Sequence, residues 1–276
     1  MGTMRIDETN CARCGICAKV CPVSAISFTA GSVPSMDNVK KLFCINCGQC
    51  EAFCPKHALD LSFPGCDAAH LPFDGSSVPP DALGRYLMNR RSVRQFRPQE
   101  VERTVIESAL EIARYAPSGK NCQPVHWVIL HSRAKRDAAL ECVIEWTRDI
   151  VAQNSPMKKR FPASAVLKLH EAGEDMVLRG APHAAIACVK TDTVMGEEAY
   201  TDGIIAMSHF DIALPSFGLG GFWCGFFTMP LMHSEKLRTI VGIPEGYRVC
   251  YAYAFGRPVC KAASFPKRKT LEADWV

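Results

Sequence analysis

Residues 11–22 read CARCGICAKVCP, and residues 44–55 read CINCGQCEAFCP. Each stretch has the spacing C-x2-C-x2-C-x3-C-P, and the similarity continues beyond it, from CPVSAISF in the first to CPKHALDL in the second. The two stretches form an internal repeat, offset by the 33 residues from Cys11 to Cys44. Eight of the chain's fifteen cysteines lie in this short segment, which indicates a metal centre rather than disulfides.

The repeat spacing is typical of two-cluster iron-sulfur proteins. Three thiolates from one tight loop can hold a cubane cluster, and the fourth cysteine of such a run normally ligates the other cluster. Residues 5–62 therefore resemble the bacterial ferredoxins that carry two 4Fe-4S clusters. We predict that one cluster is bound by Cys11, Cys14, Cys17 and Cys54, and the other by Cys44, Cys47, Cys50 and Cys21.

Structural zinc is the alternative interpretation of these cysteines, because C-x2-C pairs also bind that ion. Zinc usually takes its four ligands as two separated pairs, which would leave the third cysteine and the Cys-Pro of each run unexplained. The spacing favours clusters for this reason. Because so small a module has little core of its own, we expect the clusters to stabilise it and iron removal to unfold it.

Composition indicates an ordinary globular chain. Of the 276 residues, 48% are hydrophobic and 22% are charged, which argues against disorder. The net charge of +4 is too small to indicate nucleic-acid binding, and no RNA-binding or zinc-finger motif is present. The first residues, MGTMRIDETN, do not read as a secretory signal. Together with the many cysteines, this predicts a soluble, cytoplasmic protein.

Residues 212–232 contain no charged side chain and are long enough to cross a bilayer. The segment also contains Pro215, Pro230 and a cluster of glycines, which favour a buried helix, a tight turn and a buried strand. We therefore expect no membrane association.

The chain is predicted to have three parts. A ferredoxin-like domain spans residues 1–62, a linker rich in Pro, Gly and Ser spans 63–80, and a larger domain spans 81–276. Cys66, in the linker, is interpreted as a plain loop thiol. In the larger domain, apolar periodicity predicts helices over 81–89, 101–114, 134–152 and 199–214, and strands over 127–130, 184–189, 222–227 and 249–255. This alternation is typical of an α+β or α/β layer fold.

Three segments of the larger domain carry polar chemistry. Residues 90–94, RRSVR, could be a solvated basic turn, or could clamp a phosphate through charge-assisted bonds. Residues 116–124, APSGKNCQP, could simply end a helix, and residues 218–225, GLGGFWCG, could simply turn a helix into a buried strand. Taken together and in this order, the three segments resemble the nitroreductase family of FMN enzymes over residues 83–275. The resemblance implies an α+β fold whose antiparallel or mixed sheet is flanked by helices.

The resemblance also implies roles for individual residues. The arginine segment would hold the FMN phosphate and ribityl chain, and the second segment would line the isoalloxazine ring. A strand after GLGGFW would present the Gly225 N–H near flavin N5, and a basic pair in the tail would add a phosphate contact, with Arg257 as a weaker contender. The residues assigned to FMN are Arg90, Arg91, Ser92, Arg94, Pro117, Ser118, Asn121, Gln123, Cys224, Gly225, Lys267 and Arg268. Cys122 and Cys224 are interpreted as structural thiols within these motifs. No separate catalytic residue is predicted.

Fusion of these two parts predicts an iron-sulfur flavoprotein oxidoreductase. A cluster moves one electron at a time, whereas a flavin collects two. The expected acceptor is a small conjugated molecule such as a nitroaromatic, a quinone or an activated alkene. The expected donor is ferredoxin, with NAD(P)H as the alternative, and a non-catalytic electron carrier is the rival interpretation. The family resemblance further implies a homodimer.

Overall fold

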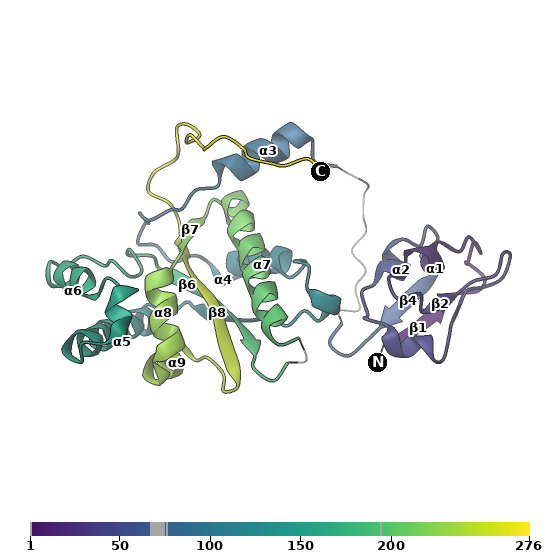
Figure 1. Cartoon of the computed structure of the whole chain (residues 1–276). Coiled ribbons are helices and arrows are strands. Elements are labelled where there is room, and N and C mark those ends of the chain that lie inside the picture. Colours follow the sequence, from purple (N-terminus) through teal and green to yellow (C-terminus); the bar gives the residue numbers. More distant parts are fainter. Residues whose placement is uncertain (1, 67–74, 76, 194) are drawn as a thin grey trace. The chain divides into compact units, whose positions relative to one another are not determined.

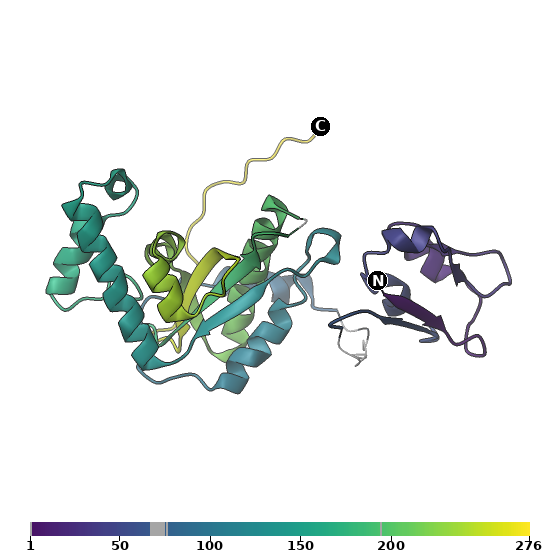
Figure 2. The same cartoon turned by 90° about the horizontal axis from the view of Figure 1, so that it is seen from below.

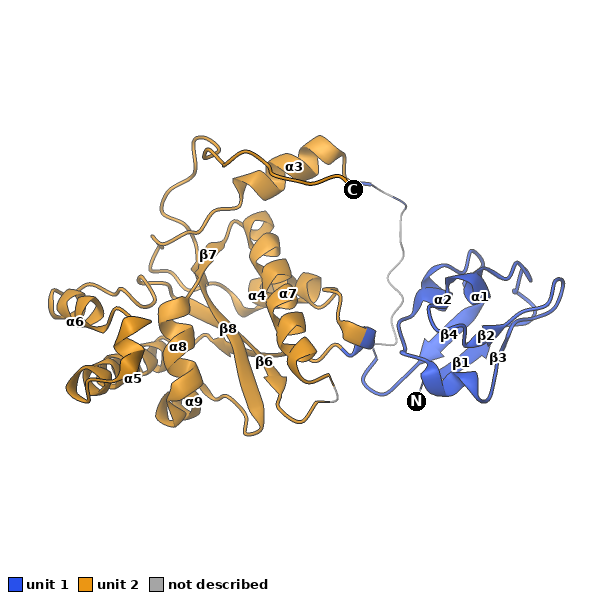
Figure 3. Cartoon of the chain, viewed as in Figure 1, with its two compact units in different colours: residues 1–77, 120–122 blue, residues 78–119, 123–276 orange. Residues whose placement is uncertain are grey.

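A computed structural model describes residues 2–66, 75, 77–193 and 195–276. The chain, drawn in Figure 1, divides into two compact units, which Figure 3 shows in blue and orange. One unit comprises residues 1–77 with 120–122, and the other comprises residues 78–119 with 123–276. Residues 67–74 and 76 of the predicted linker lie outside the described residues, so the linker boundaries stay a prediction.

The N-terminal unit contains short elements connected by the cysteine loops. Its strands are β1 (Thr3–Ile6), β2 (Ile26–Ser27), β3 (Ser35–Met36) and β4 (Leu59–Ser62), and its helices are α1 (Ile16–Val20), η1 (Lys40–Phe43) and α2 (Gln49–Ala52). Strand β1 pairs antiparallel with β4, and β2 pairs antiparallel with β3. Strands β2 and β4 follow the two repeats at equivalent positions, so the internal symmetry of the sequence is present in the fold.

The backbone repeats as closely as the sequence does. Gly15 and Gly48 each take a left-handed φ of 71° between the second and third cysteines of their runs. Arg13 and Asn46, which follow the first cysteines, take φ values of 53° and 52°. A left-handed turn is easy for glycine and costly for most other residues. Both cysteine loops therefore have the same unusual turn, although the side chains within them differ.

The C-terminal unit is built around a four-stranded sheet. Its strands are β5 (His126–Leu130), β6 (His183–Lys190), β7 (Gly220–Trp223) and β8 (Tyr247–Gly256), in the order β5-β6-β8-β7. All three pairings are antiparallel. Its helices are α3 (Pro80–Asn89), α4 (Arg103–Ala113), α5 (Arg133–Ala152), η3 (Pro156–Lys159), α6 (Ala163–Glu171), α7 (Glu197–Ala213), η4 (Leu214–Phe217), α8 (Gly225–His233) and α9 (Glu235–Val241). The short η2 (Gly119–Asn121) has residues in both units.

Helices cover both faces of this sheet, as Figures 1 and 2 show. Along β6, Ala184, Ile186 and Cys188 pack with α5, α8 and α9, whereas Ala185 and Ala187 pack with α4 and α7. This alternation follows from the two-residue period of a strand. Because both faces are covered, the strand is apolar almost throughout. The α+β class, with an antiparallel sheet flanked by helices, is therefore confirmed.

The predicted strand over residues 222–227 is wrong in its second half. Strand β7 ends at Trp223, and helix α8 begins at Gly225. The Thr228 hydroxyl donates to the Cys224 carbonyl at 2.8 Å and accepts from the Ala252 N–H at 3.0 Å, which fixes the turn against β8. An apolar run that is buried on all sides has the same sequence pattern whether it is strand or helix.

Residues 212–232 thus form a 3-10 turn, a short strand and most of a helix. Within the described part of the chain, no helix combines the length and the apolar character that a membrane span requires.

Candidate cofactor sites

Two pockets in the N-terminal unit are each lined by four cysteines. The first cysteine pocket is lined by Cys11, Cys14, Cys17 and Cys54. The second cysteine pocket is lined by Cys21, Cys44, Cys47 and Cys50. Each pocket therefore takes three cysteines from one run and the fourth cysteine from the other run.

Backbone N–H groups point at several of these sulfurs. The N–H groups of Ala25 and Ala58 donate to the thiols of Cys21 and Cys54 at 3.2 and 3.3 Å, again at equivalent places in the repeat. Such bonds stabilise negative charge on sulfur, which a metal-bound thiolate carries. Cys21 and Cys54, the crossing cysteines that each line the pocket of the other run, are therefore both held by the backbone that follows them.

In the C-terminal unit, the arginine segment 90–94 lies against the edge of β7. The Val93 N–H donates to the Gly221 carbonyl at 2.8 Å, and Ser92 forms an isolated parallel bridge with Gly221. A Cβ at Gly220 would lie 2.6 Å from a Val93 methyl group, and a Cβ at Gly221 would lie 2.3 Å from the Ala254 carbonyl oxygen. The glycines of GLGGFW are needed because the arginine segment and β8 approach their backbone closely.

A buried carboxylate on α7 anchors the same region. Asp211 accepts hydrogen bonds from the Tyr253 hydroxyl at 2.6 Å and from the Trp223 indole N–H at 3.0 Å. It also pairs with the Arg90 guanidinium at 3.4 Å, and its own side chain is only 8% exposed. Asp211 was not predicted from the sequence, because a single aspartate inside a helical pattern carries no motif. Arg90 is thus turned towards the protein interior.

The other arginines differ in their partners. Arg91 is half-buried, and Arg94 is exposed, with its guanidinium carbon 5.6 Å from the centre of the Phe222 ring. Neither forms an ion pair with another described residue. Arg257 pairs with Glu102 at 2.9 Å. The hydrogen bond from the Glu102 backbone N–H and the Arg257 charge together hold the pKa of that carboxyl below its ordinary value. The structure therefore favours Arg91 and Arg94 over Arg257 as groups able to receive an anion.

A separate pocket gathers most of the second motif. Pro117, Ser118 and Gln123 line it together with Trp127 and Asp202. The Gln123 N–H donates to the Ser118 hydroxyl at 3.0 Å. Asp202, on α7, accepts the Gly119 N–H with both carboxylate oxygens, at 3.1 and 3.2 Å. Asp202 is buried and, like Asp211, was not predicted from the sequence.

The loop between these residues has an unusual backbone. Lys120, Asn121 and Gln123 take φ values of 50°, 53° and 45°, although none is glycine. Left-handed residues of this kind are costly and cluster at functional sites. Asn121, the predicted ring contact, does not line the pocket described above.

Helix α7 separates the two motifs. Asp202 and Asp211 lie nine residues apart on it, which is about two and a half helical turns and about 13 Å. Because this separation includes a half turn beyond two full turns, the two carboxylates lie on opposite sides of the helix. The motif anchored by Asp202 and the motif anchored by Asp211 are therefore held at different positions along α7 and on different sides of it.

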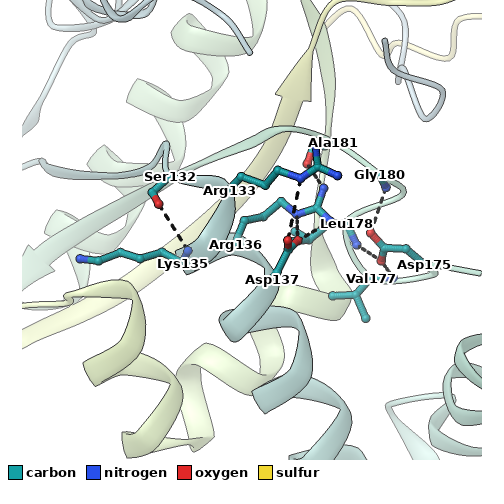
Figure 4. Close-up of polar contacts among 10 residues, drawn as sticks. All are labelled: Ser132, Arg133, Lys135, Arg136, Asp137, Asp175, Val177, Leu178, Gly180 and Ala181. Carbon is teal, nitrogen blue, oxygen red and sulfur yellow. Dashed lines mark hydrogen bonds and ion pairs between the residues drawn. The ribbon is translucent and has the colours of Figure 1, made fainter. Parts of the chain in front are cut away.

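The two residues at the start of α8 that were predicted to contact FMN, Cys224 and Gly225, differ in how their hydrogen-bond donors are used. The Cys224 thiol is buried and donates to the Val177 carbonyl at 2.9 Å, while its N–H donates to the Ala252 carbonyl at 2.9 Å. Burial raises the pKa of this thiol far above its ordinary value. Figure 4 shows how Asp175 organises the turn that contains Val177, by accepting the N–H groups of Val177, Leu178 and Gly180. Both donors of Cys224 are thus already used.

Gly225 lies at the first position of α8, not on a strand as predicted. A backbone N–H at this position has no acceptor within its own helix. The predicted donor is therefore present, but it belongs to a helix N-terminus. A Cβ at Gly225 would lie 3.3 Å from the Tyr251 hydroxyl, so the space beside it is narrow.

The tail places Lys267 and Arg268 in an exposed segment without regular structure. The Arg268 guanidinium contacts the Lys267 carbonyl at 3.3 Å. The structure does not bring this pair together with the other predicted FMN residues.

Comparison with known families agrees with this architecture. Residues 87–257 match the nitroreductase family, and residues 3–59 match a 4Fe-4S dicluster domain. The chain belongs to the nitroreductase family, with an N-terminal dicluster domain. It is 40% identical over 63 residues to Nitroreductase NfnB of Mycolicibacterium smegmatis, a match that covers 23% of this chain and 26% of that protein. The match thus spans about a quarter of the length of the curated relative.

Solved structures share the fold of the C-terminal unit. A nitroreductase with bound FMN from Bacteroides fragilis aligns with a TM-score of 0.52 and 21% identity, over 70% of this chain and 96% of that one. A nitroreductase with bound FMN from Desulfitobacterium hafniense aligns with a TM-score of 0.54 and 18% identity, over 69% and 97%.

Proposed function

We propose that this protein is an FMN-dependent oxidoreductase that passes electrons between two 4Fe-4S clusters and FMN and reduces a small conjugated acceptor. The observation that carries the proposal is the gathering of eight cysteines into two pockets of four, in the same chain as a nitroreductase fold. A 4Fe-4S cluster supplies single electrons, and FMN supplies a centre that collects two and delivers them as a hydride or singly.

The cysteine pockets fit a cubane cluster. Four thiols line each pocket, and backbone N–H groups already point at the sulfurs of Cys21 and Cys54. The cysteine spacing, which occurs twice in full, favours four-iron clusters over single zinc ions. We retain Cys11, Cys14, Cys17 and Cys54 for one cluster, and Cys21, Cys44, Cys47 and Cys50 for the other.

The arginine segment fits the phosphate of FMN. Arg91 and Arg94 offer two guanidiniums without a described acidic partner, and Ser92 offers a hydroxyl between them. Such groups bind phosphate through charge-assisted, bidentate bonds. The role of Arg90 is to hold this segment in place through Asp211. Lys267 and Arg268 of the tail are retained as additional phosphate contacts.

The second motif fits the isoalloxazine ring. Pro117, Ser118 and Gln123 line one pocket with the indole of Trp127, which combines apolar walls with a few polar groups. Asn121, which takes a left-handed backbone conformation between Ser118 and Gln123, is retained as a ring contact. The Gly225 N–H, at the start of α8, can donate to the ring, whereas we do not retain Cys224 because both of its donors are used.

A second copy of the chain would complete this site. The phosphate segment and the ring segment are anchored on opposite sides of α7, and we infer that one FMN takes them from different chains. Helix α3 also lacks any buried residue, and Leu83, Leu87 and Met88 on it are 46%, 41% and 53% exposed. In the tail, Leu271 and Trp275 are exposed to 87% and 95%. A homodimer would cover this apolar surface while bringing the two motifs together.

The electron donor follows from the cluster domain. We infer that reduced ferredoxin or a similar one-electron donor supplies the clusters, with NAD(P)H as the alternative donor. The acceptor is a nitroaromatic, a quinone or an activated alkene. The rival function is a non-catalytic electron carrier, which would use the same cofactors without binding a small acceptor.

Cofactor analysis of the anaerobically purified protein tests the core of the proposal. It should contain about eight iron and eight sulfide per chain. Arg94→Ala should release FMN and keep the cluster absorbance, while Arg103→Ala, which removes an exposed arginine of α4, should keep both. Bound zinc without labile sulfide would refute the clusters, and unchanged flavin in Arg94→Ala would refute the phosphate assignment.

Reoxidation kinetics separate the enzyme from the carrier. After anaerobic reduction, nitroaromatics, quinones and activated alkenes should reoxidise the flavin rapidly, with a rate that saturates in acceptor concentration. Electron exchange confined to ferredoxin would favour the carrier instead.

A further inference from the structure

The two cysteine pockets differ in charge at one equivalent position of the repeat. Val23 follows Cys21 by two residues and lines the second cysteine pocket. Lys56 follows Cys54 by two residues and lines the first cysteine pocket. The same backbone position thus carries an apolar side chain at one pocket and a lysine, whose side chain is exposed, at the other.

The first cysteine pocket holds its lysine in a fixed turn. The Asn10 side-chain amide donates to the Lys56 carbonyl at 2.6 Å, which ties the turn after Cys54 to the loop before Cys11. The position equivalent to Asn10 in the second repeat is Phe43, which cannot form this bond. Lys56 is therefore part of a built feature of one pocket only.

Other charges at equivalent positions act in both directions, because Asp7 and Glu8 precede Cys11 where Lys40 and Lys41 precede Cys44. Arg13 stands where the second repeat has the neutral Asn46, but its guanidinium contacts the Gly31 carbonyl at 3.5 Å and it lines neither pocket. The residue after Cys50 is Glu51, whose carboxylate accepts the N–H of Leu61 at 3.1 Å, and Leu61 lines the second cysteine pocket. The equivalent residue after Cys17 is Ala18. Asp7, Glu8, Lys40 and Lys41 are all exposed and line neither pocket.

Solvent exposure also differs. Cys14 is exposed, whereas its counterpart Cys47 is half-buried. Reduction adds one negative charge to a cluster, so nearby positive charge and solvent stabilise the reduced form, and nearby negative charge and apolar burial disfavour it. Among the residues that line the two pockets, the charge of Lys56 and the exposure of Cys14 therefore favour reduction in the first cysteine pocket.

We propose that the cluster in the first cysteine pocket has the higher reduction potential, with Lys56 as the main cause, so that the cluster in the second pocket is the stronger reductant. This inference rests on the proposed cluster content. The unit is then an ordered pair of electron sites rather than two equivalent ones.

The test is an anaerobic redox titration of the full-length protein with dithionite, followed by electron paramagnetic resonance. The unmodified protein should show two one-electron steps, separated by at least a tenfold difference in equilibrium constant, or about 59 mV. Lys56→Val, which copies the second repeat into the first, should lower the higher step and leave the lower one in place. Val23→Lys, the reciprocal change, should raise the lower step.

Arg5→Gln is the control, because it removes a positive charge of β1 that lines neither pocket. It should leave the separation of the two steps unchanged. Coincident steps in the unmodified protein, or a Lys56→Val variant in which the lower step moves, would overturn the inference. Iron and sulfide are measured on every sample, so a lack of clusters in the unmodified protein would instead refute the proposed function. If Val23→Lys lost iron, Lys56→Val would still decide the question.

Discussion

The Tyr253 hydroxyl donates to the Asp211 carboxylate across 2.6 Å, at a place where the tyrosine is fully buried and the aspartate nearly so. Burial raises the pKa of Tyr253 far above its ordinary value, with the Asp211 charge as a further cause, so the phenol remains a hydrogen-bond donor. Through Asp211, strand β8 and helix α7 together position Arg90. The arginine segment is thus held from the interior as well as from the edge of β7.

Asp211→Asn should weaken this anchor. The amide keeps an acceptor oxygen for Tyr253 or Trp223 but loses the charge that pairs with Arg90, so we expect a loss of about 1–3 kcal/mol in unfolding free energy. Urea titration followed by tryptophan fluorescence reports on the correct unit, because Trp127, Trp146, Trp223 and Trp275 all lie in it. Asp192→Asn, at an exposed position, should change nothing. Equal stability of the two variants would contradict the anchoring role.

Gly221→Ala should disrupt the same region through steric contact. The new methyl group would meet the Ala254 carbonyl and the Tyr253 ring at 2.3 Å, and such overpacking typically costs 1–3 kcal/mol. FMN content should fall as well, because the arginine segment rests on this backbone. Ser108→Ala, at an exposed position of α4, is the control, since it removes no buried contact and alanine favours the helix. A fully stable, flavin-loaded Gly221→Ala protein would show that the close approach is unimportant.

The sequence predicted the elements whose patterns are local. The cysteine spacing and the periodicity of α3, α4, α5 and α7 all depend on neighbours within a few turns, and the structure has these helices close to the predicted bounds. The strand predicted over 222–227 failed because a run buried on every side loses the period that separates strand from helix. The network around Asp211 could not be predicted, because its partners are 12 to 121 residues away in the chain.

Acidic pH should destabilise the C-terminal unit through His183. Its ring is fully buried, accepts the Val101 N–H at 2.8 Å and stacks on His131 at 4.5 Å. Burial, with His131 as a further cause, lowers its pKa from 6.5 to about 4. Because the unfolded chain binds this proton more readily, the neutral ring stabilises the fold above pH 6.5, and stability falls as the pH drops towards 4.

The expected loss over that pH range is about 3 kcal/mol. Urea midpoints from tryptophan fluorescence at several pH values measure it. His183→Gln keeps an acceptor for Val101 but cannot be protonated, so its stability should vary less with pH. An identical pH slope in this variant would assign the effect to other groups.

Paired cysteine substitutions test which thiols share a cluster. Cys21→Ser should halve the iron content, from about eight to about four atoms per chain. Adding Cys47→Ser should cost no further cluster, because both residues line the second cysteine pocket, whereas adding Cys14→Ser should remove the remaining one. Cys66→Ser should retain all the iron. The reverse result for the two double variants would mean that each run ligates its own cluster.

Helix α7 has a consequence for the layout of the proposed homodimer. The Asp211 end of each α7 would support the phosphate of one FMN, and the Asp202 end would support the ring pocket of the other. One helix, whose two carboxylates lie nine residues apart, would thus form part of the wall of both flavin sites.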